Sequence, residues 1–156
     1  MTDNPLMQIQ LDRAAVDELV HSFALAIDRR DWDLYRSLYG ATLEIDYRPE
    51  KPGMPQGTIP SEAWTQGAKA SLGALEATQH NLNPARIRID GDRAKADVYF
   101  QAHHYDTRRP GDSVFTEHGI YVFTCARDGD AWVITRIEQQ VLFAVGNARI
   151  LYAQMD

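Results

Sequence analysis

The chain has 156 residues, 44% of them hydrophobic, which is enough for a buried core, and we expect a single domain over residues 1–156. A net charge of -6, with basic residues scattered among acids, argues against nucleic acid or a membrane surface as partner and favours a small molecule or a protein. The single cysteine, Cys125, and the lack of a leader-like segment or a run of about 20 apolar residues predict a cytoplasmic protein.

The first predicted element is an amphipathic helix from about Asp12 to Arg30. Its buried stripe has the three-and-four spacing of one helix face and consists of Val16, Leu19, Val20, Phe23 and Ile27. Asp28 lies at the margin of this stripe in the last turn, where the helix dipole tends to raise the pKa of a carboxylate. A proton acceptor and a solvated surface acid both fit this position.

A short second helix is expected from its capping residue Asp31 to Tyr39, with Gly40 ending it. Residues 42–48 then alternate between apolar and polar side chains, as in a strand with one buried face. Residues 49–60 hold four prolines and two glycines, and they therefore predict a loop.

The third predicted helix begins at Ser61, directly after that loop. One of its faces is apolar and consists of Trp64, Ala68, Leu72 and Leu75. A long loop followed by a short helix can cover one mouth of a cavity.

From residue 78 onward the pattern is that of a sheet, with strands expected over 78–82, 85–90, 94–107, 113–127 and 131–143. The sequence Asp-Gly-Asp at 90–92 and again at 128–130 predicts two hairpin turns. Helices first and long antiparallel strands afterwards predict an α+β fold in which a curved sheet is wrapped on helices.

The sequence has no glycine-rich phosphate loop, no paired cysteines and no nucleophile elbow, which leaves acid–base chemistry by Asp and His. His80 follows the third helix and shares one face of the first sheet strand with Thr78 and Leu82. An imidazole held by a carboxylate can accept a substrate proton near neutral pH and return it. A structural or surface histidine is the alternative interpretation.

His103 and His104 are neighbours on a strand and point to opposite faces, so only one of them can face a cavity. A metal site that combines His80, one of this pair and His118 is an alternative to acid–base chemistry. The spacing of these residues is unlike a compact zinc motif, so we predict no metal and no cofactor.

Aromatic side chains belong to the core by default, but several of them on one concave sheet would form an apolar pocket with hydroxyl donors. The predicted substrate contacts are Tyr39, Tyr47, Trp64, Tyr99 and Tyr121. The apolar C-terminal segments 141–145 and 150–152 indicate a homo-oligomer, either a dimer or a trimer.

Two stretches carry a family resemblance: Ala-Ile-Asp-Arg-Arg-Asp-Trp at 26–32, where the first helix ends, and Thr-Gln-His-Asn at 78–81, ahead of the long strands. With the order of elements, they make the chain resemble the SnoaL-like branch of the nuclear-transport-factor-2-like superfamily over nearly its whole length. The resemblance implies a cone-shaped, strongly curved antiparallel or mixed sheet packed on three N-terminal helices, with a pocket inside. Members to which the chain is similar are hexachlorocyclohexane dehydrochlorinase, scytalone dehydratase and bile-acid 7α-dehydratase.

In these members an Asp and a His remove a proton while a leaving group departs, and Asp28 and His80 match that pair. The resemblance therefore implies a cofactor-independent lyase, dehydratase or isomerase for a small apolar cyclic molecule. Arg127 is a candidate match for a catalytic arginine of the dehydrochlorinase and is therefore also a predicted substrate contact, whereas Phe23 stands where that enzyme has a lysine. The superfamily also contains non-catalytic ligand-binding modules and structural subunits of oxygenase assemblies, and these are the alternative.

Overall fold

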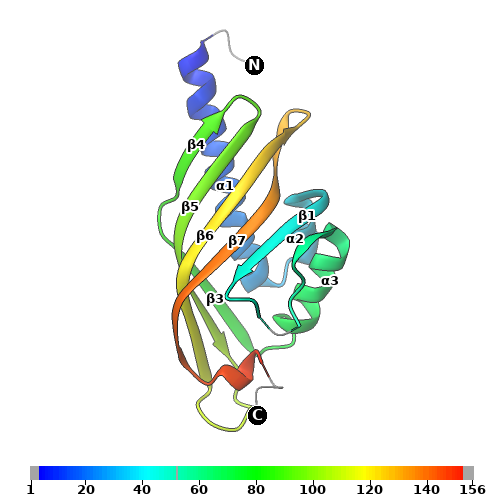
Figure 1. Cartoon of the computed structure of the whole chain (residues 1–156), viewed down its shortest axis with the longest axis vertical. Helices are drawn as coiled ribbons and strands as arrows, with labels where there is room; N and C mark the ends of the chain where they lie inside the picture. The colour runs from blue at the N-terminus through cyan, green and yellow to red at the C-terminus, as the bar shows by residue number, and fades with distance from the viewer. Residues whose placement is uncertain (1–3, 52, 153–156) are drawn as a thin grey trace.

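The computed structural model describes residues 4–51 and 53–152 of the chain. Three helices, α1 (Pro5–Arg29), α2 (Trp32–Ser37) and α3 (Ser61–Ser71), pack against one strongly curved sheet (Figure 1). The strands are β1 (Tyr39–Arg48), β2 (Gly57–Pro60), β3 (Ala77–Leu82), β4 (Arg86–Asp90), β5 (Arg93–Tyr105), β6 (Val114–Asp128) and β7 (Ala131–Gly146). A short 3-10 helix, η1 (Ala148–Ile150), follows the last strand.

The seven strands follow the order β2-β1-β7-β6-β5-β3, and β4 pairs with β5 beside β3. β1 runs parallel to β7, while the other pairings are antiparallel. An open, mixed sheet packed on three helices confirms the predicted α+β fold class.

The long strands β5, β6 and β7 bend around α1, so the sheet has a concave inner face and a convex outer face (Figure 1). The β6–β7 register shifts between His118 and Gly119, a bulge that adds to the bend. At Gly119 a Cβ atom would lie 2.0 Å from the carbonyl oxygen of Gln140, so the close approach of the two strands requires glycine.

Side chains along β5 alternate between the two faces. Phe100, Ala102 and His104 are buried on the inner face, whereas Tyr99 is exposed on the outer face. The inner face packs against α1, whose predicted apolar stripe is buried as expected. Cys125 is likewise buried on the inner face of β6, in agreement with a role as a small hydrophobic residue.

The first helix begins earlier than the sequence pattern predicts. Asn4 is its cap and accepts hydrogen bonds from the backbone N–H groups of Leu6 and Met7, and Pro5 occupies the first helical position. Asp12, the predicted cap, instead lies inside the helix and is buried. The prediction started too late because the first turns carry exposed apolar residues that do not join the buried stripe.

Two further boundaries differ from the prediction. The second helix ends at Ser37, and Gly40 lies within β1 instead of ending the helix. Residues 57–60 of the predicted loop form the short edge strand β2, which pairs with β1. The two predicted hairpin turns are confirmed, with Gly91 at φ 55° and Gly129 at φ 61°.

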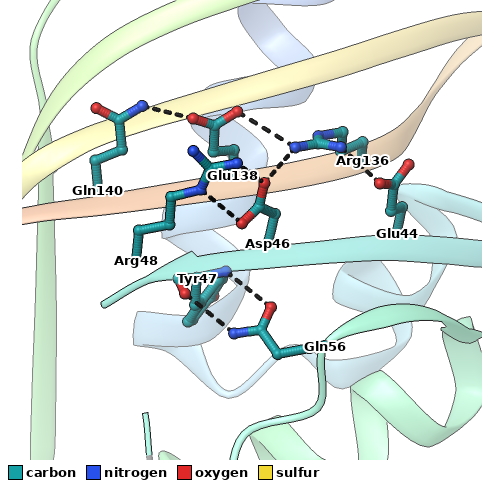
Figure 2. Close-up of polar contacts among 8 residues, drawn as sticks. All are labelled: Glu44, Asp46, Tyr47, Arg48, Gln56, Arg136, Glu138 and Gln140. Carbon is teal, nitrogen blue, oxygen red and sulfur yellow. Dashed lines mark hydrogen bonds and ion pairs between the residues drawn. The ribbon is translucent and has the colours of Figure 1, made fainter. Parts of the chain in front are cut away.

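The outer face of β1 and β7 is charged. Arg136 on β7 lies between Glu44 and Asp46 of β1 and also contacts Glu138, while Arg48 pairs with Asp46 (Figure 2). The ion pairs of Arg136 with Glu44 and Asp46 cross from β7 to β1 and stabilise the parallel pairing of the two strands from the solvent side.

The far end of β7 is apolar instead. Its exposed side chains are Leu142, Phe143 and Val145. The segment after β7 folds back onto the sheet, because Ile150 is buried and the Tyr152 hydroxyl donates to Glu117. The predicted homo-oligomer stays a prediction, and of the two segments from which it was predicted, the end of β7 is the one with exposed apolar side chains. Within residues 4–51 and 53–152, no helix is both long and apolar enough to cross a membrane.

Candidate functional site

The last turn of α1 meets β3 through Asp28. Its Oδ1 atom accepts a hydrogen bond from His80 Nδ1 at 2.8 Å and another from Thr78 Oγ1 at 2.9 Å. Its Oδ2 atom accepts the backbone N–H of His80 at 2.7 Å. The structure therefore brings together the two residues that the sequence predicts to be catalytic, and three donors fix the carboxylate.

Local chain geometry explains how these groups meet. Arg30 adopts a left-handed conformation, with φ 60°, which ends α1 directly after Asp28. Its guanidinium donates to Thr78 Oγ1 at 2.7 Å, and the Thr78 hydroxyl in turn donates to Asp28. Thr78 and His80 are two residues apart on β3 and so share the face that looks at α1.

The charge state of Asp28 follows from its donors. Burial raises the pKa of this carboxyl, but the hydrogen bonds and charge of His80 and the hydrogen bond of Thr78 outweigh burial, and the net pKa is lower than usual. The upward shift expected from the helix dipole is thus wrong in direction, because that argument left out the donors on β3. An ionised carboxylate accepts Nδ1–H of His80, which leaves the lone pair on Nε2.

His80 forms part of the wall of a cavity of about 290 Å³ between the helices and the inner face of the sheet. Most of this wall is apolar or aromatic. Lining side chains outside the predicted set include Phe23, Ile27, Tyr35, Met54, Leu72, Ala102 and Leu151. The imidazole is 3% exposed and Asp28 20% exposed, so their hydrogen bond is shielded from bulk water.

A second imidazole, that of His104, lies beside His80 in the cavity wall. The two rings meet edge to face with their centroids 5.9 Å apart. Burial, followed by the charge of His80, lowers the pKa of His104 to about 3, and its Nδ1 lies 3.2 Å from the carbonyl oxygen of Phe115. His104 is therefore neutral at physiological pH, and its uncharged ring lies beside His80 in the cavity wall.

A buried ion pair completes the polar part of the wall. Lys51 Nζ lies 2.8 Å from Glu117 Oε2, with side chains that are 9% and 5% exposed. The Tyr152 hydroxyl donates to the other oxygen of Glu117 at 2.9 Å. Lys51 comes from the predicted loop and Tyr152 from the C-terminal segment, so two segments distant in sequence close the cavity over one strand residue.

The loop that carries Lys51 is also held at its other end. The side-chain amide of Gln56 accepts the backbone N–H of Tyr47 at 3.1 Å and donates to its carbonyl oxygen at 3.0 Å (Figure 2). Met54 and Pro55 between these two attachments line the cavity. The prediction that this loop and α3 cover one mouth of a cavity agrees with the structure.

The chain resembles known proteins in both sequence and structure. A family model described as a SnoaL-like domain matches residues 8–138. The chain belongs to the SnoaL-like family. None of the curated protein sequences matches it.

Solved structures place this SnoaL-like chain among proteins with the nuclear-transport-factor-2-like fold. The Kfla4162 protein from Kribbella flavida is 27% identical, with a TM-score of 0.84 over 92% of this chain and 98% of that one. A type 2 hexachlorocyclohexane dehydrochlorinase is 14% identical, with a TM-score of 0.70 over 91% of this chain and 93% of that one. The LinA-type3 dehydrochlorinase from Novosphingobium barchaimii LL02 is 13% identical, with a TM-score of 0.72 over 91% and 94% of the two chains.

Three of the predicted substrate contacts of this SnoaL-like protein line the cavity, namely Tyr47, Trp64 and Tyr121. Burial is the main cause that raises the pKa of Tyr47 and Tyr121, so both hydroxyls stay protonated and can donate. Tyr39 is buried but lies behind the wall, where its ring packs edge-on against Tyr35 at 5.3 Å.

The other two predicted contacts lie elsewhere. Tyr99 is 60% exposed on the outer face because its neighbours on β5 point inward. Arg127 pairs with Asp12 and Asp92 near the hairpin turns, six residues along β6 from the cavity residue Tyr121 and thus about 20 Å away along the strand. We therefore leave Tyr99 and Arg127 out of the candidate site.

The histidines do not gather in one place either. His80 and His104 face the cavity, whereas His118 stacks on Phe143 at 4.3 Å on the outer face and His103 contacts Thr116 there. The set proposed for the metal alternative is thus split between two faces of the sheet. Among the described residues, no three His, Cys, Asp or Glu side chains cluster as a metal site.

Sequence reasoning missed four polar residues of the wall, Lys51, Glu117, Gln139 and Tyr152, and left open which of His103 and His104 faces the cavity. Strand alternation could have identified His104 and Glu117, since His104 shares the inward positions of β5 with Phe100, and Glu117 those of β6 with Phe115. A charged residue at an inward position signals either a site or a buried pair. Lys51 and Tyr152 lie in irregular segments, where no periodic pattern applies.

Proposed function

We propose that this SnoaL-like protein is a cofactor-independent lyase of the dehydratase type, or an isomerase, that acts on a small apolar cyclic molecule. His80 is the general base in this proposal, and Asp28 orients it. The observation that carries the proposal is the 2.8 Å hydrogen bond from His80 Nδ1 to Asp28, made by an imidazole that lines an apolar cavity.

The proposed reaction begins when Nε2 of His80 takes a proton from a substrate carbon. The electron pair of the broken C–H bond forms a new double bond, and in a lyase the leaving group departs with its own bonding pair. In an isomerase the imidazolium returns the proton to a different carbon. Asp28 holds the productive tautomer and stabilises the imidazolium charge through Nδ1–H.

The cavity wall supports an apolar substrate with few polar groups. Tyr47 and Tyr121 can donate hydrogen bonds to an oxygen of the substrate or of the leaving group. Neighbours that are named dehydrochlorinases have the same fold, which supports lyase-type chemistry by analogy.

A non-catalytic ligand-binding module is the alternative. That alternative predicts an acid and an imidazole beyond hydrogen-bond reach, or a cavity filled by side chains. The 2.8 Å contact and the cavity of about 290 Å³ favour the enzyme over the module.

The test is proton exchange in deuterium oxide with a panel of hydroxylated polycyclic ketones, steroids and aromatic-pathway intermediates, followed by NMR. We expect the wild-type protein to exchange or eliminate from at least one compound. His80→Ala should lose about 10²–10⁴-fold of that rate while its circular dichroism spectrum is unchanged. A folded His80→Ala variant with the wild-type rate would contradict the mechanism.

A further inference from the structure

Lys51 has hydrogen-bonding capacity that the protein itself does not use. An ammonium has three N–H donors, and Glu117 takes one of them at 2.8 Å. The ammonium also lies over the ring of Tyr47, 5.2 Å from its centroid, but its other two N–H donors have no hydrogen-bonding oxygen or nitrogen among residues 4–51 and 53–152, although the side chain is buried and lines the cavity. Burial lowers the pKa of Lys51, and the charge of Glu117 opposes this change. Unused donors on a buried ammonium indicate that a ligand oxygen completes its coordination.

A second buried group in the same wall is also unsatisfied. The side-chain amide of Gln139 donates to the Tyr121 hydroxyl at 2.9 Å, and its oxygen has no partner among the described residues. Turning the amide around would exchange its two ends and leave one of them unpaired all the same. Gln139 is 3% exposed and lines the cavity, so it also points to a polar group on the ligand.

The register of the sheet places the ion pair close to the proposed base. His80 pairs with Ala102, and Ala102 pairs with Glu117 on the next strand. Two strand spacings separate His80 from Glu117, about 10 Å between Cα atoms, and the small side chain between them leaves room for a ring. A substrate lying over Ala102 can therefore contact the His80 imidazole and the Lys51 ammonium together.

The charge of this pair restricts the ligand group. A carboxylate or phosphate would compete with Glu117 for Lys51 and bring two anions together in an apolar cavity, which is unfavourable. A cation would be repelled by the ammonium. A neutral carbonyl oxygen accepts the free N–H donors without disturbing the pair, and it is also the atom on which charge develops when a neighbouring C–H bond is broken.

We propose that Lys51, held in place by Glu117, binds the carbonyl oxygen of a cyclic ketone whose neighbouring C–H bond faces His80. This inference rests on the proposed function and deepens it, because it assigns the binding of the substrate carbonyl to Lys51 and the placement of Lys51 to Glu117. When His80 takes the proton, the C–H electron pair forms a carbon–carbon double bond, and the carbonyl π pair moves to the oxygen. Lys51 stabilises the resulting enolate by hydrogen bonding.

The probe is 1-tetralone, a two-ring ketone, compared with tetralin and 1-tetralol, which share its carbon skeleton. Binding is measured by the fluorescence of the protein, since Trp64 lines the cavity, and the carbonyl stretching band of bound 1-tetralone is recorded by infrared spectroscopy. We expect the wild type to prefer the ketone over tetralin by about tenfold or more, with the band at lower frequency than in an apolar solvent.

Two variants separate recognition by the ammonium from a structural role of the ion pair. Lys51→Met keeps an unbranched side chain that is one atom shorter and lacks the ammonium, and it should abolish both the ketone preference and the band shift, while tetralin still binds. Glu117→Gln frees the ammonium and should keep or strengthen the preference. If the Lys51–Glu117 ion pair has only a structural role, both variants should change the ketone preference in the same way. The double variant Lys51→Met/Glu117→Gln carries no buried charge and should behave as Lys51→Met does, even if the single variant folds poorly.

Several results would overturn the inference: equal binding of ketone and tetralin by the wild type, preference for the alcohol, no ketone binding, or an unchanged preference in folded Lys51→Met protein. His80→Ala should retain the ketone preference, because its imidazole acts on the C–H bond. Loss of the ketone preference and loss of proton exchange are therefore separate outcomes, and failure of this inference can be told from failure of the proposed function.

Discussion

Asp28 holds His80 at two points, because one carboxylate oxygen accepts the imidazole N–H at 2.8 Å and the other accepts the backbone N–H of the same residue at 2.7 Å. The side chain and the strand that carries it are thus fixed by a single group. Such a double attachment sets the direction of Nε2 as well as the tautomer, and both are needed by a general base that acts on a substrate carbon.

Asp28→Asn should reduce proton exchange by about 10²–10⁴-fold. An amide cannot accept at both positions, since its NH₂ group would face either the backbone N–H of His80 or the ring nitrogen. When the NH₂ group faces the ring nitrogen, Nδ1 must accept a hydrogen bond and the ring proton lies on Nε2. Nε2 can then no longer take a proton from the substrate. The measurement is the deuterium exchange rate of a responsive substrate.

The matched control is Thr78→Val. It removes the hydrogen bond from Thr78 to Asp28 and the one that Thr78 accepts from Arg30, but it leaves both bonds between Asp28 and His80, so we expect a loss of less than about tenfold. Equal losses in the two variants would indicate a general disturbance of the contact between α1 and β3, and they would argue against a specific role for the carboxylate.

His104 should make the protein less stable in acid. Burial lowers its pKa to about 3 in the folded state, whereas the unfolded chain has the ordinary value of 6.5, so the unfolded chain binds the proton first as pH falls. The stability that comes from the neutral ring is complete above about pH 6.5 and is lost between there and about pH 3. The loss is at most about 1.4 kcal/mol per pH unit.

Urea unfolding of the wild type and of His104→Gln at a series of pH values between 7 and 4 measures this effect. The variant should show a flatter dependence of its free energy of unfolding on pH, because the titrating group is gone. Parallel curves for the two proteins would show that His104 does not control the acid response.

Arg127→Met should lower stability without changing the chemistry. The guanidinium bonds Asp12 at 2.8 Å and lies over the ring of Trp132, so its loss leaves a buried carboxylate poorly compensated and costs about 1–3 kcal/mol. Exchange activity per folded molecule should equal that of the wild type. The control is Asp92→Asn, which removes the charge of the exposed partner of Arg127. It should lower the free energy of unfolding by less than about 1 kcal/mol. A specific loss of activity in Arg127→Met would return this residue to the site.

Phe143→Asp should dissociate the predicted homo-oligomer. We expect self-association through the exposed apolar end of β7, and a charge there would be desolvated on contact. We expect light scattering to give a multiple of 17.7 kDa for the wild type and 17.7 kDa for the variant. Leu25→Asp on α1 serves as the control and should keep the larger mass. A monomeric wild-type protein would contradict the prediction.

The fold could be predicted well because its signals are periodic. The stripe on α1 repeats with the helix, the strands alternate, and the Asp-Gly-Asp turns mark two hairpins. The parallel pairing of β1 with β7 was beyond such reasoning, since it joins elements far apart in the sequence and depends on how the sheet curves.

The site was predictable in part. Asp28 and His80 were found from short motifs and the family resemblance, which give chain positions but no distances. Tyr99 and Arg127 were chosen by residue type, although alternation along β5 and the length of β6 take them away from the cavity. Lys51 could not be found in this way, because its contact with Glu117 joins a loop to a strand with no local pattern.

The cavity is closed by two segments, one from the proline-rich loop and one from the C-terminal end of the chain, while Asp28 and His80 belong to α1 and β3. In the proposed enzyme, the choice of substrate and the proton transfer are therefore encoded in separate stretches of the gene. We expect a combinatorial library confined to residues 53–56 to alter the range of accepted compounds while the proposed catalytic pair is unchanged.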